Sequence, residues 1–158
     1  MSKMKLKLML AGVFVGCALV AWKLAWATPG SGLTITSLSG PATLGSIDTK
    51  SETDGLEIEI KTKGSSDVFV ARIQIAPGGR GGWHSHPGPS IISVVSGTAT
   101  FYQGDDPNTP HLYFAGSGFV EDADLVHDVR NEGDTDLELV VVQIVPLGAP
   151  RRIDEPAP

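Results

Sequence analysis

Residues 69–97 read FVARIQIAPGGRGGWHSHPGPSIISVVSG, and this stretch decides the fold. Every second residue from Phe69 to Ile75 is apolar, which is the period-two pattern of a β-strand with one buried face. Turn-forming Gly and Pro residues then interrupt the chain on both sides of a short segment that holds His84 and His86. In an extended chain, residues two apart point their side chains to the same side, as two ligands of one metal ion require. Such a pair also occurs by chance in solvated turns.

The rest of the chain continues the β pattern. Short runs of β-branched and aromatic residues alternate with turns rich in Gly, Pro, Asn and Asp, and no stretch shows the 3.6-residue apolar stripe of a helix. Runs at this spacing, roughly 8 to 12 residues, predict an all-β fold, either an antiparallel sandwich or a barrel. The last run is apolar on both faces apart from Glu138 and Gln143, which predicts a central strand. The runs are 56–61, 91–95, 98–103, 111–114, 125–129 and 137–145.

The charges are divided unevenly along the chain. Of the 12 Lys and Arg residues, four lie in the first 23 positions, whereas all 18 Asp and Glu residues lie from Asp48 onward. The chain after residue 23 therefore holds eight basic and 18 acidic residues, a formal charge of −10. A surface of this sign repels phosphate backbones and anionic lipid headgroups, so we expect no nucleic-acid partner.

The N-terminus has the three parts of a secretory signal. Lysines open the chain, residues 8–22 carry no charge, and Ala25-Trp26-Ala27 provides a small-x-small cleavage site. We therefore expect residues 1–27 to be a signal peptide and the mature protein to be periplasmic or secreted. The alternative is an uncleaved inner-membrane anchor, with Lys23 reaching the headgroups. Cleavage would remove Cys17, the only cysteine, and with it any disulfide, zinc-thiolate site or cysteine nucleophile.

A third histidine occurs in a second ordered motif. The first segment reads Gly78-x5-His84-x-His86-x3-Ser90-x6-Gly97, and the second reads Gly116-x5-Asp122-x-Asp124-x2-His127-x3-Asn131. Together they resemble the two motifs of the cupin superfamily, G-x5-H-x-H-x3-4-E-x6-G and G-x5-P-x-G-x2-H-x3-N, over about residues 67–145. The resemblance implies a cupin-type antiparallel β-barrel (a double-stranded β-helix, or jelly roll) in which His84, His86 and His127 share one metal ion.

The sequence departs from the family pattern at three positions. The family's glutamate ligand falls on Ser90, and the proline and glycine of the second motif fall on Asp122 and Asp124. Loss of the glutamate removes the only anionic ligand, so the ion is held less firmly and stays more electrophilic. Three imidazoles favour Fe, Mn, Co, Ni, Cu or Zn over Mg or Ca. Some cupin-like thiol dioxygenases also use three histidines without a glutamate; the alternative is an inherited barrel whose site has decayed.

These features predict an exported cupin that binds a small molecule at a mononuclear three-histidine metal site. The reaction that we expect is an oxygen-dependent, dioxygenase-type oxidation in which the substrate chelates the ion. Two alternatives stay open: a non-enzymatic module of the cell envelope that binds a metal or small ligand, and a metal-free isomerase of a carbohydrate derivative. No nucleophile elbow and no Walker or dinucleotide fingerprint occurs, so no nucleotide cofactor is expected, and no catalytic residue is assigned.

Other polar residues are weaker candidates. Ser90 should lie near the place that the family's carboxylate fills. If Phe101 points into the barrel, Gln103 does too, which makes Gln103 a candidate for a hydrogen bond to the substrate or to a metal ligand. His111 is expected at the surface. The acidic residues around the third histidine are interpreted as a solvated rim, in which one carboxylate could orient an imidazole; they are Glu121, Asp122, Asp124 and Asp128.

The expected organisation is one domain with flanking segments. Residues 28–54 are expected to form an N-terminal arm, residues 55–148 the barrel, and residues 149–158 a surface tail. The barrel interior is the expected cavity for a small-molecule ligand. Cupin barrels often pair through edge strands, and the arm could exchange between subunits, which is compatible with a homodimer. A membrane contact is expected only through residues 1–27, if they stay attached.

Overall fold

A computed structural model describes residues 27–158, so residues 1–26 of the predicted signal or anchor segment lie outside the described part of the chain. Every regular element among the described residues is a β-strand, which confirms the all-β prediction. In this part of the chain, no helix has the length and apolar character that a membrane crossing requires.

The strands follow one another with short connections, as the turn residues in the sequence predict. In chain order they are β1 (Ser31–Leu44), β2 (Asp48–Thr53), β3 (Leu56–Lys61), β4 (Ser66–Arg80), β5 (His84–Ser85), β6 (Ser90–Ser96), β7 (Thr98–Gln103), β8 (Asp106–Phe114), β9 (Gly118–Glu121), β10 (His127–Arg130), β11 (Leu137–Pro146) and β12 (Ile153–Asp154).

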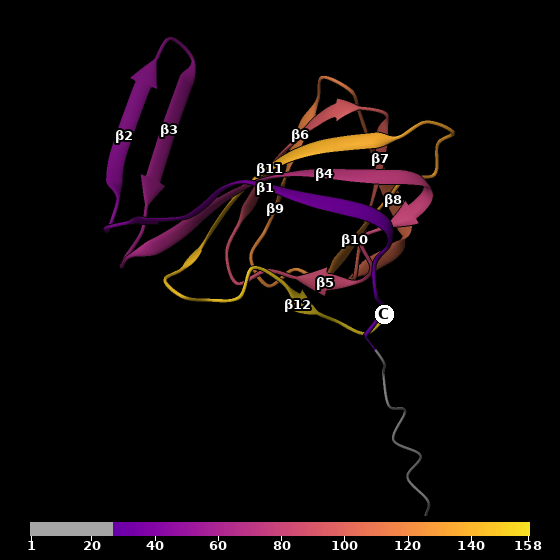
Figure 1. Cartoon of the computed structure of the whole chain (residues 1–158). Coiled ribbons are helices and arrows are strands. Elements are labelled where there is room, and N and C mark those ends of the chain that lie inside the picture. Colours follow the sequence, from indigo (N-terminus) through magenta and orange to yellow (C-terminus); the bar gives the residue numbers. More distant parts are fainter. Residues whose placement is uncertain (1–26) are drawn as a thin grey trace, which may run out of the picture.

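Ten of these strands form one sheet that curls into a nearly closed antiparallel barrel (Figure 1). One wall holds β1, β4, β11, β6 and β9 in that order, and the other holds β12, β5, β10, β7 and β8. The end of β4 joins the two walls, because Arg80 pairs with Arg130 of β10. Strand β11 lies between β4 and β6, which confirms the predicted central strand.

The core lies between the two walls. Alternate residues of β11, beginning with Leu137, are buried and pack against Phe101 and Phe119, whose ring centroids are 5.2 Å apart. Because side chains alternate between the faces of a strand, the same alternation sends every second residue of these strands into the barrel. Some core residues also face the cavity described below; they are Ile75, Ile92, Val129, Leu139 and Val141.

Two motif residues have structural roles. Gly97 has a φ of 75°, and an added Cβ would lie 2.8 Å from the carbonyl oxygen of Asp136, so the turn between β6 and β7 requires glycine. Asn131 is buried, and its Nδ2 donates to the carbonyl oxygens of Ile75 and Thr135 at 2.7 and 2.8 Å. The hydrogen bonds of the motif asparagine therefore hold the turn after β10 against β4.

Strands β2 and β3 form a separate hairpin that projects from the barrel (Figure 1). The alternating residues Leu56, Ile58 and Ile60 do form a strand, but they are 57, 46 and 42 % exposed and pair only with β2. The expectation that the barrel begins at residue 55 is wrong in this respect. Strand β1, which was expected in an arm, pairs along β4 and belongs to the barrel sheet instead.

Candidate metal centre

Three histidines converge inside the barrel. His84 begins β5, His86 follows it, and His127 begins β10, where it pairs directly with His84. All three imidazoles are buried, and one ring nitrogen from each lies within 4.8 Å of the others. A group of this size and composition could hold one metal ion.

Backbone carbonyls orient all three imidazoles. The Nδ1 atom of His84 lies 2.6 Å from the carbonyl oxygen of Gly82, that of His86 lies 2.6 Å from the carbonyl oxygen of Arg151, and that of His127 lies 2.8 Å from the carbonyl oxygen of Leu125. Since a carbonyl oxygen only accepts, each Nδ1 carries a proton, and in a neutral ring the Nε2 then keeps its lone pair for an ion. Metal-binding histidines are held in this way.

A buried carboxylate lies beside two of the three histidines. Glu121, on β9, is 4 % exposed, and its two carboxylate oxygens each lie 3.2 Å from an imidazole Nε2, one from His86 and one from His127. The pairing of β6 with β9 sets Glu121 directly opposite Ser90. The carboxylate therefore enters from the strand beside the position that the family's glutamate would occupy.

The predicted acidic rim is only half correct. Asp122 and Asp124 are exposed, as expected, whereas Glu121 and Asp128 are buried. Asp128 accepts a hydrogen bond from Nε of Arg130 at 2.8 Å and points away from the histidine group, because it alternates with His127 along β10. Strand alternation places Glu121 on the inward face with Phe119, and this signal was available in the sequence.

The electrostatics of the group favour a cation at its centre. Burial and the nearby His127, Arg152 and His86 lower the pKa of His84 to about 3, against an opposing hydrogen bond to Gly82, so His84 is neutral at physiological pH. Burial alone would raise the pKa of Glu121, but the imidazoles of His127 and His86, each 3.2 Å from one of its oxygens, hold the pKa well below its usual range. The carboxylate is therefore charged.

The environment of one buried nitrogen, Nε2 of His127, indicates whether a metal ion fits the site. The Nδ1–H of His127 already donates to a carbonyl, so its Nε2 has no proton to give to Glu121 in the neutral ring. Among the described residues, this Nε2 has no hydrogen-bond partner. A buried lone pair beside a carboxylate is costly without a positive partner, and a metal ion supplies one. The donor set thus fits the ion that the motifs predict.

The C-terminal segment closes one side of the site. Strand β12 pairs with β5, with Asp154 opposite His84, and the backbone carbonyl of Arg151 is the one that accepts from His86. The side chains of Arg151 and Arg152 both line the cavity. The prediction that residues 149–158 form a surface tail is therefore wrong. Three prolines and two arginines carry no periodic pattern, so no local pattern in this segment predicts that it docks on β5.

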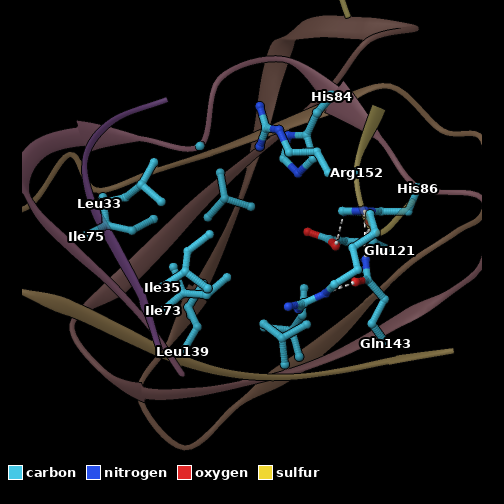
Figure 2. Close-up of a pocket in the computed structure, with 15 residues that line it drawn as sticks. Leu33, Ile35, Ile73, Ile75, His84, His86, Glu121, Leu139, Gln143 and Arg152 are labelled. Atoms are coloured by element: carbon cyan, nitrogen blue, oxygen red, sulfur yellow. Dashed lines mark hydrogen bonds and ion pairs between the residues drawn. The ribbon is translucent and has the colours of Figure 1, made fainter. Parts of the chain in front are cut away.

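A cavity of about 190 Å³ opens next to the histidines. Figure 2 shows that its two sides differ in chemistry. The aliphatic side is formed by Leu33, Ile35, Ile73, Ile75 and Leu139, and the polar side by His84, His86, Glu121, Gln143 and Arg152. Such a cavity can hold a small, mostly apolar molecule with its polar end toward the histidines.

The other polar residues that the sequence suggested for the site differ in burial and position. Ser90 is fully buried, and its Oγ accepts a hydrogen bond from Nε2 of Gln143 at 3.3 Å. Gln103 lies opposite His127 on β7, but it is not among the described residues that line the cavity. His111 is exposed, as expected.

Gln143 was missed as a site residue. Its Nε2 donates to the carbonyl oxygen of Arg151 at 2.9 Å and lies 2.8 Å from Nδ1 of His86. It occupies an inward position of β11, in step with the buried Leu139 and Val141. A lone amide among the inward residues of a central strand is a signal that the sequence did contain.

Comparison with protein families matches residues 71–143 to the Cupin domain. Residues 71–143 are a cupin domain. Among solved structures, this cupin resembles the polyketide cyclase RemF from Streptomyces resistomycificus, with 15 % identity, a TM-score of 0.56, and coverage of 80 % of this chain and 73 % of that chain. It also resembles a cupin superfamily protein from Desulfitobacterium hafniense DCB-2, with 10 % identity, a TM-score of 0.51, and coverage of 73 % and 79 %.

A conserved protein of unknown function from Streptococcus pyogenes aligns with 20 % identity and a TM-score of 0.45, covering 51 % of this cupin and 66 % of that chain. The curated proteins contain no match. At these identities the structural likeness shows the fold alone.

Proposed function

We propose that this cupin holds one divalent transition-metal ion (Fe, Mn, Co, Ni, Cu or Zn) at His84, His86 and His127, with Glu121 as an added anionic ligand. The observation that carries the proposal is the common orientation of the three imidazoles, each with Nδ1 on a backbone carbonyl and Nε2 toward the shared centre. Nitrogen donors with one carboxylate suit these ions better than Mg or Ca. Glu121 supplies the negative charge that position 90 lacks.

The reaction that the site supports best is a dioxygenase-type oxidation of a small organic molecule in the barrel cavity. When bound, the ion would supply the Lewis acidity and redox chemistry that activate the substrate toward O2. Both atoms of O2 enter the product of such a reaction, so no separate reductant is needed.

The chain's own residues would prepare this chemistry. The aliphatic wall gives the substrate side of the site an apolar lining. The carbonyls of Gly82, Leu125 and Arg151 prevent the imidazoles from rotating, and the buried carboxylate of Glu121 offsets part of the ion's charge. The cavity then orients a substrate with its polar end at the histidines.

Oxygen consumption tests the proposal. The purified protein, reconstituted with Fe or Cu, would be supplied with a panel of phenols, diketones and thiols in an oxygen electrode, beside a His84→Ala/His86→Ala double variant. We expect O2 uptake with at least one compound, one O2 for each substrate consumed, and its loss in the variant and after chelation. No uptake across the panel, or uptake that survives the double substitution, would contradict the proposal.

One observation favours a non-enzymatic binding module as the second candidate. The buried carboxylate of Glu121, beside His86 and His127, would add a fourth ligand to the three histidines. Catalytic sites keep coordination positions open, whereas structural sites close them. A tightly held ion together with ligand binding and no turnover would support a role in sensing or storage at the cell envelope.

We further propose that the protein is exported, with residues 1–27 acting as a cleaved signal. The support is the lysine-rich start, the uncharged run and the Ala25-Trp26-Ala27 triplet. Mass spectrometry of the protein from a bacterial periplasmic fraction should give an N-terminus at Thr28. Full-length protein in the inner-membrane fraction would support an uncleaved anchor instead.

A further inference from the structure

We propose that the cavity binds a small aliphatic carboxylate, whose anionic end pairs with the guanidinium of Arg151 while its apolar body lies along the aliphatic wall. The inference rests on the proposed function only in that a bound divalent ion adds to the positive charge of the cavity. The pairing itself depends on Arg151 and the cavity.

Arg151 is held in place but lacks an acidic partner. Its Nε donates to Oε1 of Gln143 at 3.1 Å, and its guanidinium lies over the ring of Phe69, 4.7 Å from the centroid. Within residues 27–158, no carboxylate forms an ion pair with it. Burial lowers the pKa of Arg151, which shows that its charge is partly removed from water. An arginine keeps its charge regardless, so a bound anion would relieve this cost.

The neighbouring Arg152, in contrast, already has an acidic partner. Nε of Arg152 lies 2.5 Å from Oδ1 of Asp154, which offsets its charge within the C-terminal segment. Of the two arginines that line the cavity, only Arg151 therefore has a free charge for a ligand. A planar guanidinium with one nitrogen already fixed presents its other N–H groups in the geometry that a carboxylate matches.

The charge of the groups that line the cavity differs in sign from the net charge of the protein around it. The chain after residue 23 is strongly acidic, yet the cavity holds an unpaired arginine and one carboxylate, and that carboxylate faces the metal site. With a divalent ion present, the interior carries a net positive charge. An anion that passes the acidic surface is therefore attracted only inside the barrel, and the cavity selects for negative charge.

The size and lining of the cavity limit the rest of the ligand. About 190 Å³ corresponds to the space of about six water molecules, so the ligand is small. All of the apolar lining is aliphatic, which suits a short hydrocarbon body without further polar groups. The aliphatic lining residues are Leu33, Ile35, Ile73, Ile75, Ile92, Val129, Leu139 and Val141.

The side chain and the backbone of Arg151 have separate tasks, which makes the inference testable. Its carbonyl oxygen accepts from Nδ1 of His86, whereas its guanidinium lines the cavity. Arg151→Met keeps the carbonyl and most of the side-chain volume but removes the charge. The metal content should therefore survive this substitution. Arg72→Met is the matched control, because Arg72 is exposed and pairs with Glu138 on the outer face of the barrel.

Isothermal titration calorimetry gives the test, with the full protein as purified and again after metal removal. The probes are acetate, butyrate, hexanoate and decanoate, with hexanamide as the neutral analogue. We expect hexanoate to bind at least tenfold more tightly than hexanamide. Affinity should rise by up to about fourfold for each methylene up to the length that fills the cavity. Decanoate should gain nothing over hexanoate. Arg151→Met should weaken hexanoate at least tenfold and leave hexanamide unchanged, and Arg72→Met should have no effect.

Equal binding of hexanoate and hexanamide, or undiminished hexanoate binding by Arg151→Met, would overturn the inference. Failure of this inference can be distinguished from failure of the proposed function. Carboxylate binding that depends on Arg151 in a protein that takes up no metal would sustain the carboxylate site and refute the metal site. Metal uptake without a preference for carboxylates would do the reverse.

Discussion

The neutral state of His84 has a measurable consequence for the stability of the metal-free protein. In the unfolded chain this histidine has an ordinary pKa near 6.5, whereas in the fold burial and the neighbouring His127, Arg152 and His86 lower the pKa to about 3. The unfolded state therefore takes up a proton on acidification that the folded state does not, and stability is lost as the pH falls through 6.5 toward 3. Proton linkage predicts that the free energy of unfolding falls by about 2 kcal/mol between pH 7 and pH 5. Glu121, with an ordinary value of 4.5 and a lowered pKa, contributes mainly below this window.

Urea unfolding in the presence of a chelator, followed by tryptophan fluorescence at pH 7, 6 and 5, measures this loss. His84→Gln should remove most of the pH dependence, because the residue that titrates in the unfolded state is gone. His111→Gln is the control and should retain the dependence, since His111 is exposed. A change smaller than about 0.5 kcal/mol, or the full dependence in His84→Gln, would refute the reasoning that burial keeps this imidazole neutral.

Three further predictions concern the ion and the core. Glu121→Gln keeps the shape of the side chain but removes its charge, so chelator competition should show a metal affinity about 10- to 100-fold lower; an unchanged affinity would exclude Glu121 as a ligand. Adding the ion at 100 times its dissociation constant should stabilise the protein by about 2.7 kcal/mol in thermal unfolding, and no increase in Tm would contradict a site in the folded state. Leu137→Ala should cost about 3–5 kcal/mol in denaturant unfolding because Leu137 is fully buried; a cost below about 1 kcal/mol would place Leu137 outside the tightly packed core.

Much of the fold could be predicted because it depends on local patterns. Period-two alternation marks the strands of the barrel, and glycines of the motifs mark turns such as the one at Gly97, whose positive φ excludes other residues. The resemblance to the cupin motifs implies that three imidazoles meet, and they do. The strand at 56–61 shows the limit of this reasoning: alternation predicts a strand, but it does not say whether the apolar face meets the core.

The chemical character of the site depends on contacts between distant segments, which no local pattern encodes. Glu121 enters the site because β9 pairs with β6 in a register that sets it opposite Ser90. Arg151 reaches the cavity because β12 docks on β5 near the end of the chain. Inward alternation on β9 and β11 would have pointed to Glu121 and Gln143, and the sequence interpretation did not follow it to those two polar residues.

The central claim is that the three histidines and Glu121 bind one transition-metal ion, and metal stoichiometry tests it most directly. Elemental analysis by mass spectrometry would be made on the mature protein, purified without a His-tag, beside the His84→Ala/His86→Ala variant. The account predicts close to one equivalent of Fe, Mn, Co, Ni, Cu or Zn in the native protein and its loss in the variant. A native protein that contains no metal, and takes up none on titration, would contradict the account.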